Sequence, residues 1–452
     1  MVALLFLPFG CKRLTIQKPT SNVILIHSTK HITKEVTNIM KIRAANGSYS
    51  PSNFYMHIES NEQIEECVRN NEQTFVHEYI HFLQDLILPY SIRNTLTSKR
   101  RFLSVLLHAN KVKKIIRPFS EWDDDTQLTD RQFSSTWGCD DFIDENVKIK
   151  SLKNEFFTID TGARVFKYIL VLENNSEYHV GARDFLEYIA HKIETKHWET
   201  SHPHFPYMTV DSLFDFLGFD YVADEVRVCF VEYCLYNDNP LNMFFNIIEE
   251  LKINNMISVL DTFDSCSHYL INRPWEAKGG FNETIFTKTQ RRLFDFKESL
   301  SLTYSGNNFP NIQRWIQLVI DFAKTELSNK FIFAELFRLN GDDFFIKING
   351  FIQEIGIPLV MNNNGECISL LPEDFDQNEF MQLLTVLALM IYVSGSDRNC
   401  ALIDLCRVSN PNVTNSLCTT NPILRAHDDE LCPFGLLIKN YGLHKIDWEY
   451  HS

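Results

Sequence analysis

The stretch His77-Glu78-Tyr79-Ile80-His81 decides how the fold of this chain is interpreted. On an α-helix, residues four positions apart lie on one face, so the imidazoles at 77 and 81 can bind one metal ion. Glu78 follows the first histidine and can accept a proton from a water molecule at an open coordination position. The H-E-x-x-H spacing therefore predicts a metal site, provided that the segment is helical and buried.

The flanking sequence predicts a buried helix over residues 71–88. Asn70 is the expected N-cap, Gln73 follows three residues later as in a capping box, and Pro89 is expected to end the helix. Apolar residues lie on all sides of this helix: Phe75, Val76, Tyr79, Ile80, Phe82, Leu83, Leu86 and Ile87. Polar groups inside such a helix need partners or a metal. The alternative is a structural helix whose histidines make ordinary hydrogen bonds.

A second helix is expected after a β-hairpin. Alternating apolar residues predict the hairpin over residues 165–180, and residues 180–194 predict the helix. Glu187, His191 and Glu194 lie on one face of that helix, at positions i, i+4 and i+7.

An H-E-x-x-H helix, a hairpin and a second helix with a glutamate resemble the gluzincin branch of the zincin zinc metallopeptidases. The resemblance implies a zincin-like core with a small β-sheet beside the active-site helix. It also implies a zinc ion bound by His77, His81 and Glu187, with a large insertion between the last two. Gluzincins often carry an acid four residues after the ligand glutamate, where this chain has His191. The extended metzincin pattern is absent.

Other residues remain open as ligands or partners. His191, Asp184 and Glu194 are rivals of Glu187 as the third zinc ligand, and those that do not bind zinc could orient the ligand histidines. Five of the 15 histidines fall between residues 179 and 204, which points to a cluster near the metal. The alternative for the second-helix acids is that they are solvated and make ordinary ion pairs. We expect the last three of these histidines, His197, His202 and His204, to form a surface loop. Candidates for a partner of the ligands or a transition-state donor are His191, Glu194, His179, Tyr188, Tyr178 and Tyr233.

Composition predicts a helix-rich α+β protein with a mostly helical C-terminal part. The 452 residues include only 16 Gly and 15 Pro but 36 Phe. We expect a zincin-like core with insertions over residues 1–328 and a helical, Cys-containing region over 329–452. The expected strands are 22–27, 36–42 and 54–57, and the later helices are 224–237, 240–252, 287–302, 312–327 and 379–393.

Charge and hydropathy exclude several classes of protein. The net charge of -15 disfavours binding to nucleic acid or to an anionic membrane. No apolar run approaches the roughly 20 residues of a membrane-spanning helix, and residues 2–9 are too short a run for a signal peptide. Without a signal, 11 cysteines indicate reduced thiols in the cytoplasm. The basic stretch 98–117 and the acidic residues after it are expected to be solvated faces that neutralise each other.

The last 53 residues hold four cysteines: Cys400, Cys406, Cys418 and Cys432. Structural zinc sites usually contain a C-x-x-C pair, which is absent here. We therefore expect buried reduced thiols, with a second zinc as the alternative.

The sequence thus predicts a zinc-dependent metalloendopeptidase of the cytoplasm, with Glu78 as general base and a protein or peptide as substrate. Uncontrolled cleavage would damage the host cell, so a regulatory partner or trigger is expected. Two other classes remain: a metal-stabilised binding or regulatory protein without turnover, and a metal-free helical scaffold.

Overall fold

In the computed structural model, the described residues are 42–44, 46–144, 146–160, 162–276, 282–305, 309–326, 330–395 and 397–450. The fold is helix-rich with small sheets, consistent with the predicted α+β class. The apolar run 2–9, the predicted strand 22–27 and all but the last residue of 36–42 lie outside the described residues. Within the described part of the chain, no helix has the length and apolar character needed to cross a membrane.

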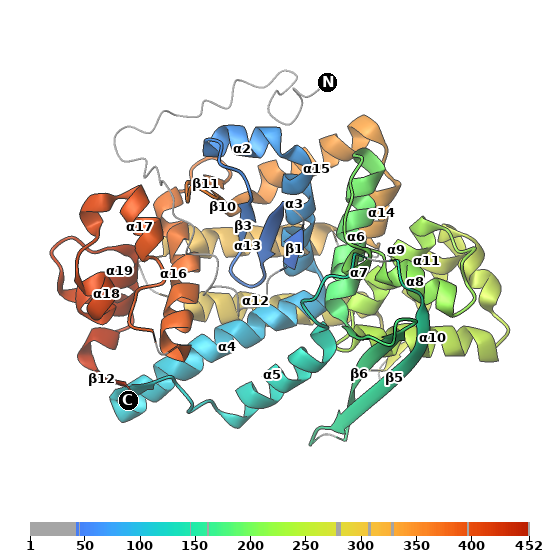
Figure 1. Cartoon of the computed structure of the whole chain (residues 1–452), viewed down its shortest axis with the longest axis horizontal. Helices are drawn as coiled ribbons and strands as arrows, with labels where there is room; N and C mark the ends of the chain where they lie inside the picture. Colours follow the sequence, from blue (N-terminus) through green and yellow to red (C-terminus); the bar gives the residue numbers. More distant parts are fainter. Residues whose placement is uncertain are drawn as a thin grey trace.

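Helix α3 (Glu72–Ile87) lies at the centre of the molecule, beside a five-stranded sheet (Figure 1). In spatial order, the strands are β1 (Ile42–Ala44), β2 (Gly47–Ser50), β3 (Tyr55–Ile58), β10 (Ile357–Asn362) and β11 (Cys367–Leu370). Strands β3 and β10 are parallel, and the other neighbours are antiparallel. Residues on both sides of position 328 therefore share one sheet.

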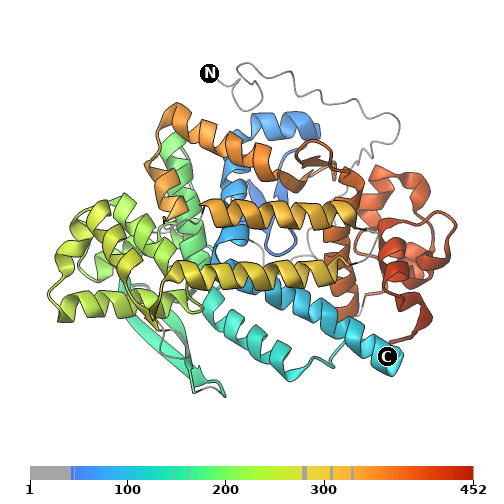
Figure 2. The ribbon, with the colours of Figure 1, turned by 180° about the vertical axis from the view of Figure 1, so that it is seen from behind.

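Long helices bury α3 from behind. Helix α4 (Pro89–Val112) begins two residues after α3 ends, with Pro89 in its first turn, where no N–H is needed. Helices α12 (Ile285–Thr303) and α13 (Pro310–Glu326) cross the back of the molecule side by side (Figure 2). Trp315 of α13 stacks against Phe82 of α3 and donates a hydrogen bond to the Ile355 carbonyl at 2.9 Å.

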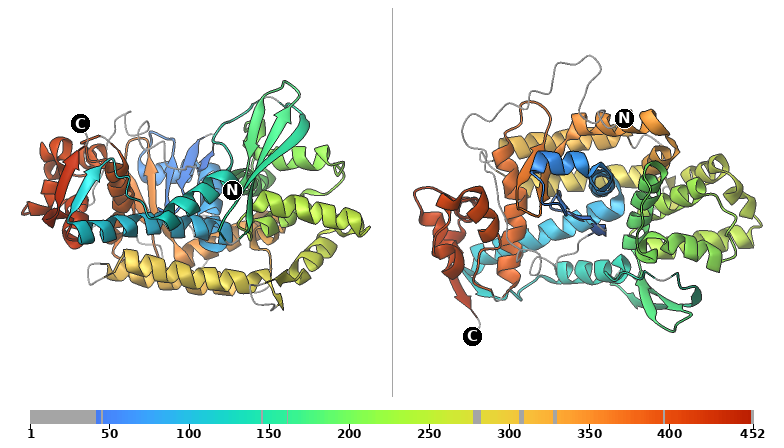
Figure 3. Two further views of the ribbon diagram at one scale, coloured as in Figure 1. Left: turned by 90° about the horizontal axis from the view of Figure 1, so that it is seen from below. Right: turned by 45° about the horizontal axis from the view of Figure 1, so that its top comes forward.

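A sheet of three antiparallel strands projects from the body, and its last strand leads into α6 (Figure 3). These elements are β5 (Ile149–Thr158), β6 (Arg164–Leu172), β7 (Glu177–Val180) and α6 (Ala182–His197). Further helices are α2 (Ile64–Asn70), α5 (Asp124–Trp137), α7 (His204–Tyr207), α8 (Thr209–Phe216), α9 (Asp224–Leu235), α10 (Pro240–Ile253), α11 (Phe263–Asn272), α14 (Ile332–Arg338), α15 (Gly341–Ile355) and α16 (Gln377–Ser394). Two further strand pairs are β4 (Lys114–Arg117) with β12 (Asp447–Tyr450) and β8 (Trp275–Glu276) with β9 (Asn282–Glu283).

Most predicted elements are confirmed. The five later helices match α9, α10, α12, α13 and α16 to within two residues at each end. Two local predictions are wrong. Asn70 ends α2 instead of capping α3, and Asn71 has no capping hydrogen bond to the α3 backbone. The basic stretch is not wholly solvated, because Lys99 is fully buried.

The turn before α6 has no room for a side chain. A Cβ at Gly181 would lie 2.2 Å from backbone atoms of Trp137 and Gly138. We expect Gly181→Ala to lower the free energy of unfolding by about 1–3 kcal/mol or more, because the backbone must move to relieve the clash. Chemical denaturation measures this change. Gly350→Ala is the control, because a Cβ at Gly350 on α15 would point into open space. This substitution should raise the free energy of unfolding by about 0.5–1 kcal/mol. Equal effects of both substitutions would contradict the packing described.

A buried carboxyl on α9 makes stability depend on pH. Glu232 accepts a hydrogen bond from the Ala334 backbone N–H at 2.8 Å. Burial raises its pKa to about 8, although backbone N–H groups at the start of α14 oppose the rise. The folded pKa lies above the unfolded one, so the stabilisation is complete below about pH 4 and is lost as the pH rises through about 8.

We expect the free energy of unfolding of the wild type to fall, relative to that of Glu232→Gln, by about 1 kcal/mol for each pH unit between about pH 5 and 8. Denaturation curves at a series of pH values measure this difference. A difference that does not change with pH would overturn the assignment of a buried protonated carboxyl.

Candidate metal centre

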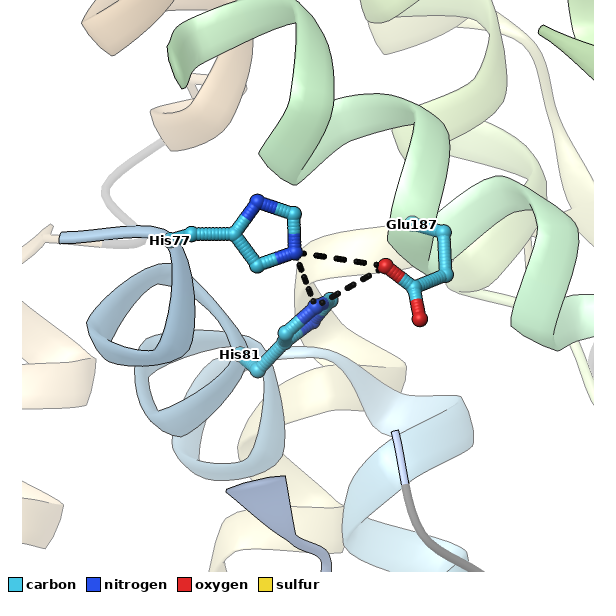
Figure 4. A group of neighbouring side chains, drawn as sticks. All are labelled: His77, His81 and Glu187. Carbon is cyan, nitrogen blue, oxygen red and sulfur yellow. Dashed lines mark hydrogen bonds and ion pairs between the residues drawn. The ribbon is translucent and has the colours of Figure 1, made fainter. Parts of the chain in front are cut away.

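Helices α3 and α6 bring three predicted ligands together (Figure 4). Helix α3 presents His77 and His81 one turn apart, with their Nε2 atoms separated by 3.1 Å. Helix α6 presents Glu187, whose Oε2 lies 3.3 Å from each of these nitrogens. All three residues have no exposed surface.

Outer partners fix where each histidine carries its proton. His77 Nδ1 lies 2.8 Å from Glu194 Oε2 and must donate to it, because an ionised carboxylate only accepts. Gln84 donates through Nε2 to the Leu186 carbonyl at 3.0 Å, which leaves its Oε1 to accept from His81 Nδ1 at 2.7 Å. Each imidazole with its proton on Nδ1 points a bare Nε2 lone pair at Glu187.

The arrangement fits a divalent cation. Three lone pairs that converge in a buried space repel one another unless a positive charge lies between them. Tetrahedral zinc with ligands at about 2.0–2.1 Å separates its ligand atoms by about 3.3 Å, close to the distances found here. Glu187 Oε1 is buried and has no hydrogen-bond partner among the described residues. Two imidazoles and one carboxylate are a common ligand set of catalytic zinc.

The electrostatics of the site also favour a cation. Burial opposes ionisation of Glu187, but the neighbouring imidazoles of His77 and His81 outweigh it and lower its pKa to about 2. The pKa of Glu194 is lowered in the same way, mainly by His77 and His202. The pKa of His77 is raised because Glu194 and Glu187 outweigh burial, whereas burial lowers that of His81. Two ionised carboxylates therefore surround the space between the imidazoles.

Glu194 is the centre of a second layer around the ligands. Its Oε2 also lies 3.0 Å from His202 Nε2, and its Oε1 accepts from Gln73 Nε2 at 2.7 Å. His191, Glu194 and His202 offer ligand atoms within 4.8 Å of one another. The interpretation of His202 as a surface residue is wrong, since its side chain is 5% exposed. His197 and His204 contact Phe344 and Ser212 instead.

Two residues beside the ligands complete the site. Glu78 is fully buried on α3, and a Cβ at Gly47 of β2 would lie 2.9 Å from its Oε1, so the start of β2 passes close to this carboxylate. Tyr207 was missed by the sequence analysis. Its ring centroid lies 6.1 Å from that of His77 and 5.4 Å from that of His191. Burial, and then the carboxylates of Glu187 and Glu78, raise the pKa of Tyr207, so its phenol remains a donor.

Other candidates use their polar atoms elsewhere. His179 Nε2 lies 3.1 Å from the Ser135 carbonyl, and the Tyr188 hydroxyl donates to Asp211 at 2.8 Å. Asp184 accepts hydrogen bonds from the Gly181 N–H at 2.8 Å and from the hydroxyls of Tyr178 and Thr209. It therefore stabilises the start of α6. Tyr233 lies 3.4 Å from Arg273 Nη1.

Comparisons of the chain with protein-family models, with curated proteins and with solved structures give no match. The interpretation of the site therefore depends on its own geometry.

Substitution of single ligands tests this geometry. We expect Glu187→Ala to lose one zinc per chain relative to the wild type, because two imidazoles alone bind the ion too weakly to survive dialysis. His191→Ala, the control on the same face of α6, should keep the wild-type content. Mass spectrometry of the metal in dialysed protein measures both. Loss of zinc in His191→Ala, with retention in Glu187→Ala, would move the third ligand to His191.

Proposed function

We propose that the protein is a zinc-dependent metallopeptidase of the zincin type, similar to gluzincins, that hydrolyses a protein or peptide substrate. One observation carries the proposal: the Nε2 lone pairs of His77 and His81 and the Glu187 carboxylate converge at the separations of a tetrahedral zinc site. Glu78 lies on the same helix, directly after the first ligand.

The roles of the residues follow from their places. Zinc, when bound, polarises the substrate carbonyl and makes the attacking water more acidic. Glu78 accepts the proton of that water and passes it to the leaving amine. The protonated phenol of Tyr207, whose ring contacts that of His77, would donate a hydrogen bond to the developing oxyanion. Glu194 and Gln84 hold the two imidazoles in orientation.

The closed state of the site supports a regulated activity. Two segments cover the ligands. One contains Phe205 and Tyr207, and the other contains Phe142 and Ile143. Ile143 and Phe205 exchange backbone hydrogen bonds of 3.2 and 3.0 Å, and the Phe142 ring stacks on Tyr207 at 6.4 Å. A pocket beside His81, lined also by Asp85 and other residues, has room for about one water molecule. An extended peptide needs these segments to move apart, so a partner, trigger or narrow substrate range fits the proposal.

The same burial favours a second candidate, a metal-stabilised binding or regulatory protein without turnover. In that case the ion would hold α3 against α6, and the cover would stay closed. The two candidates differ in whether the loaded protein cleaves any peptide.

Substitution of the proposed general base, Glu78, separates zinc binding from turnover. We expect Glu78→Gln to keep its zinc and to lose peptide hydrolysis by a factor of about 10² or more, because the amide cannot take the proton. Turnover is measured on a diverse peptide mixture, and metal content on the same samples. Glu65→Gln, on the exposed face of α2, should behave as wild type.

Turnover retained by Glu78→Gln would contradict its role as base. A zinc-loaded wild type that cleaves nothing in the mixture would favour the binding protein instead.

A further inference from the structure

A second group of possible metal ligands lies beyond the Nδ1 side of His77. His191 and Glu194 belong to α6, and His202 belongs to the segment that follows this helix. Each of the three offers one ligand atom, and these atoms lie within 4.8 Å of one another. The ring centroids of His191 and His202 are 5.0 Å apart, and the two rings are nearly perpendicular. The fold thus gathers two imidazoles and a carboxylate, the ligand types of the first site, from two separate segments.

The C-terminal cysteines, the alternative zinc ligands of the sequence analysis, do not form such a group. Cys400, Cys418 and Cys432 are buried and Cys406 is partly buried, all four as free thiols. They lie on or beside the short helices α17 (Ile403–Ser409), α18 (Leu417–Thr420) and α19 (Pro433–Asn440). In the part of the chain that the structure describes, only the two histidine–glutamate groups bring three possible ligand atoms this close together.

Two ring nitrogens of the second group are left unsatisfied. His191 Nδ1 and His202 Nδ1 are buried and make no hydrogen bond to any described residue. His191 is 7% exposed, and the side chain of His202 is 5% exposed. A buried polar atom without a partner costs free energy, so the hydrogen bonds of this structure do not satisfy the group. A cation between the rings would give each imidazole a partner.

Glu194 carries a negative charge that an ion at the first site leaves unbalanced. An imidazole that binds a metal through Nε2 and keeps its proton on Nδ1 is neutral, so His77 then gives Glu194 only a hydrogen bond. Among the ion pairs of the described residues, Glu194 has only histidine partners. Lys192 on the same helix pairs with Asp211 and Asp224 instead. A carboxylate that is buried in this way needs a positive charge beside it.

We propose that His191, Glu194 and His202 bind a second divalent cation of the zinc class. Imidazole and carboxylate ligands suit such ions. Ligand atoms around tetrahedral zinc lie about 3.3 Å apart, so side-chain shifts of about 1 Å would bring the three atoms to this separation. The ion must replace the hydrogen bond of 3.0 Å between His202 Nε2 and Glu194 Oε2. Because of this cost the second site is the weaker one, and its ion exchanges with free metal and is lost on dialysis.

The second ion would tie the covering segment to α6. His202 lies between the end of α6 and Tyr207, whose ring centroid is 4.5 Å from that of His202 and 5.4 Å from that of His191. Coordination of His202 therefore holds this segment, and Tyr207 with it, over the first site. The concentration of free metal then sets how firmly the cover is closed. The second site does not depend on the proposed peptidase activity.

Isothermal titration calorimetry with Zn²⁺ tests the second site on dialysed protein. We expect the wild type to bind one further equivalent of zinc, and we expect His191→Ala and His202→Ala each to lose it. His204→Ala is the matched control, because His204 lies two residues after His202 but contacts Ser212. It should keep the further equivalent. Added zinc should also raise the Tm of the wild type by more than that of His202→Ala, because binding to the folded state stabilises it.

Binding of the further equivalent by both His191→Ala and His202→Ala would overturn the proposal, as would its absence from the wild type. Its loss from His204→Ala would do the same, because the fold of the segment and not ligation would then govern binding. Circular dichroism shows whether each variant is folded. A dialysed wild type without zinc would count against the first site alone, since the difference between His202→Ala and the wild type still decides the second.

Discussion

The structure depends on three ligand atoms that converge in the interior, Nε2 of His77, Nε2 of His81 and Oε2 of Glu187. Because Glu194 and Gln84 accept the Nδ1 protons, the bare nitrogens of His77 and His81 both point at Glu187. Such an arrangement is costly in a protein core unless a cation occupies the space between the ligands. The packing of α3 against α6 therefore links the fold to the candidate metal site, and the rest of the site follows from it.

The same packing explains why a catalytic arrangement would be closed in this state. The segment after α6 turns back over the ligands, so that His202 and Tyr207 lie on the His77 ring. A second segment, around Phe142, covers Tyr207 in turn. Access thus depends on two loops that are joined to each other by backbone hydrogen bonds. In the proposed peptidase, movement of these loops would decide whether a substrate reaches the ligands.

Local patterns in the sequence predicted the helices and the three residues that the structure brings together as candidate ligands, whereas contacts made by loops could not be predicted. His77 and His81 lie at helical spacing on α3, as do Glu187 and Glu194 on α6, and this periodicity survives in any fold that buries those faces. Gln73 was expected to cap its own helix, yet it reaches across to Glu194. Tyr207 gives no local signal, because its position depends on the path of the chain after α6. Histidine clustering was the one hint of His202.

The C-terminal cysteines show the same limit. Cys400 and Cys418 become neighbours only through the fold, by a backbone hydrogen bond between segments far apart in the sequence. Helix prediction was reliable in the same part of the chain because α16 is long and strongly periodic.

Anomalous X-ray diffraction from crystals of the purified protein, recorded on both sides of the zinc absorption edge, tests the central claim most directly. The account predicts a zinc peak bonded to His77 Nε2, His81 Nε2 and a Glu187 oxygen, each at about 2.0–2.2 Å. No peak at this position in zinc-supplied crystals, with a proton shared between the two Nε2 atoms instead, would contradict it.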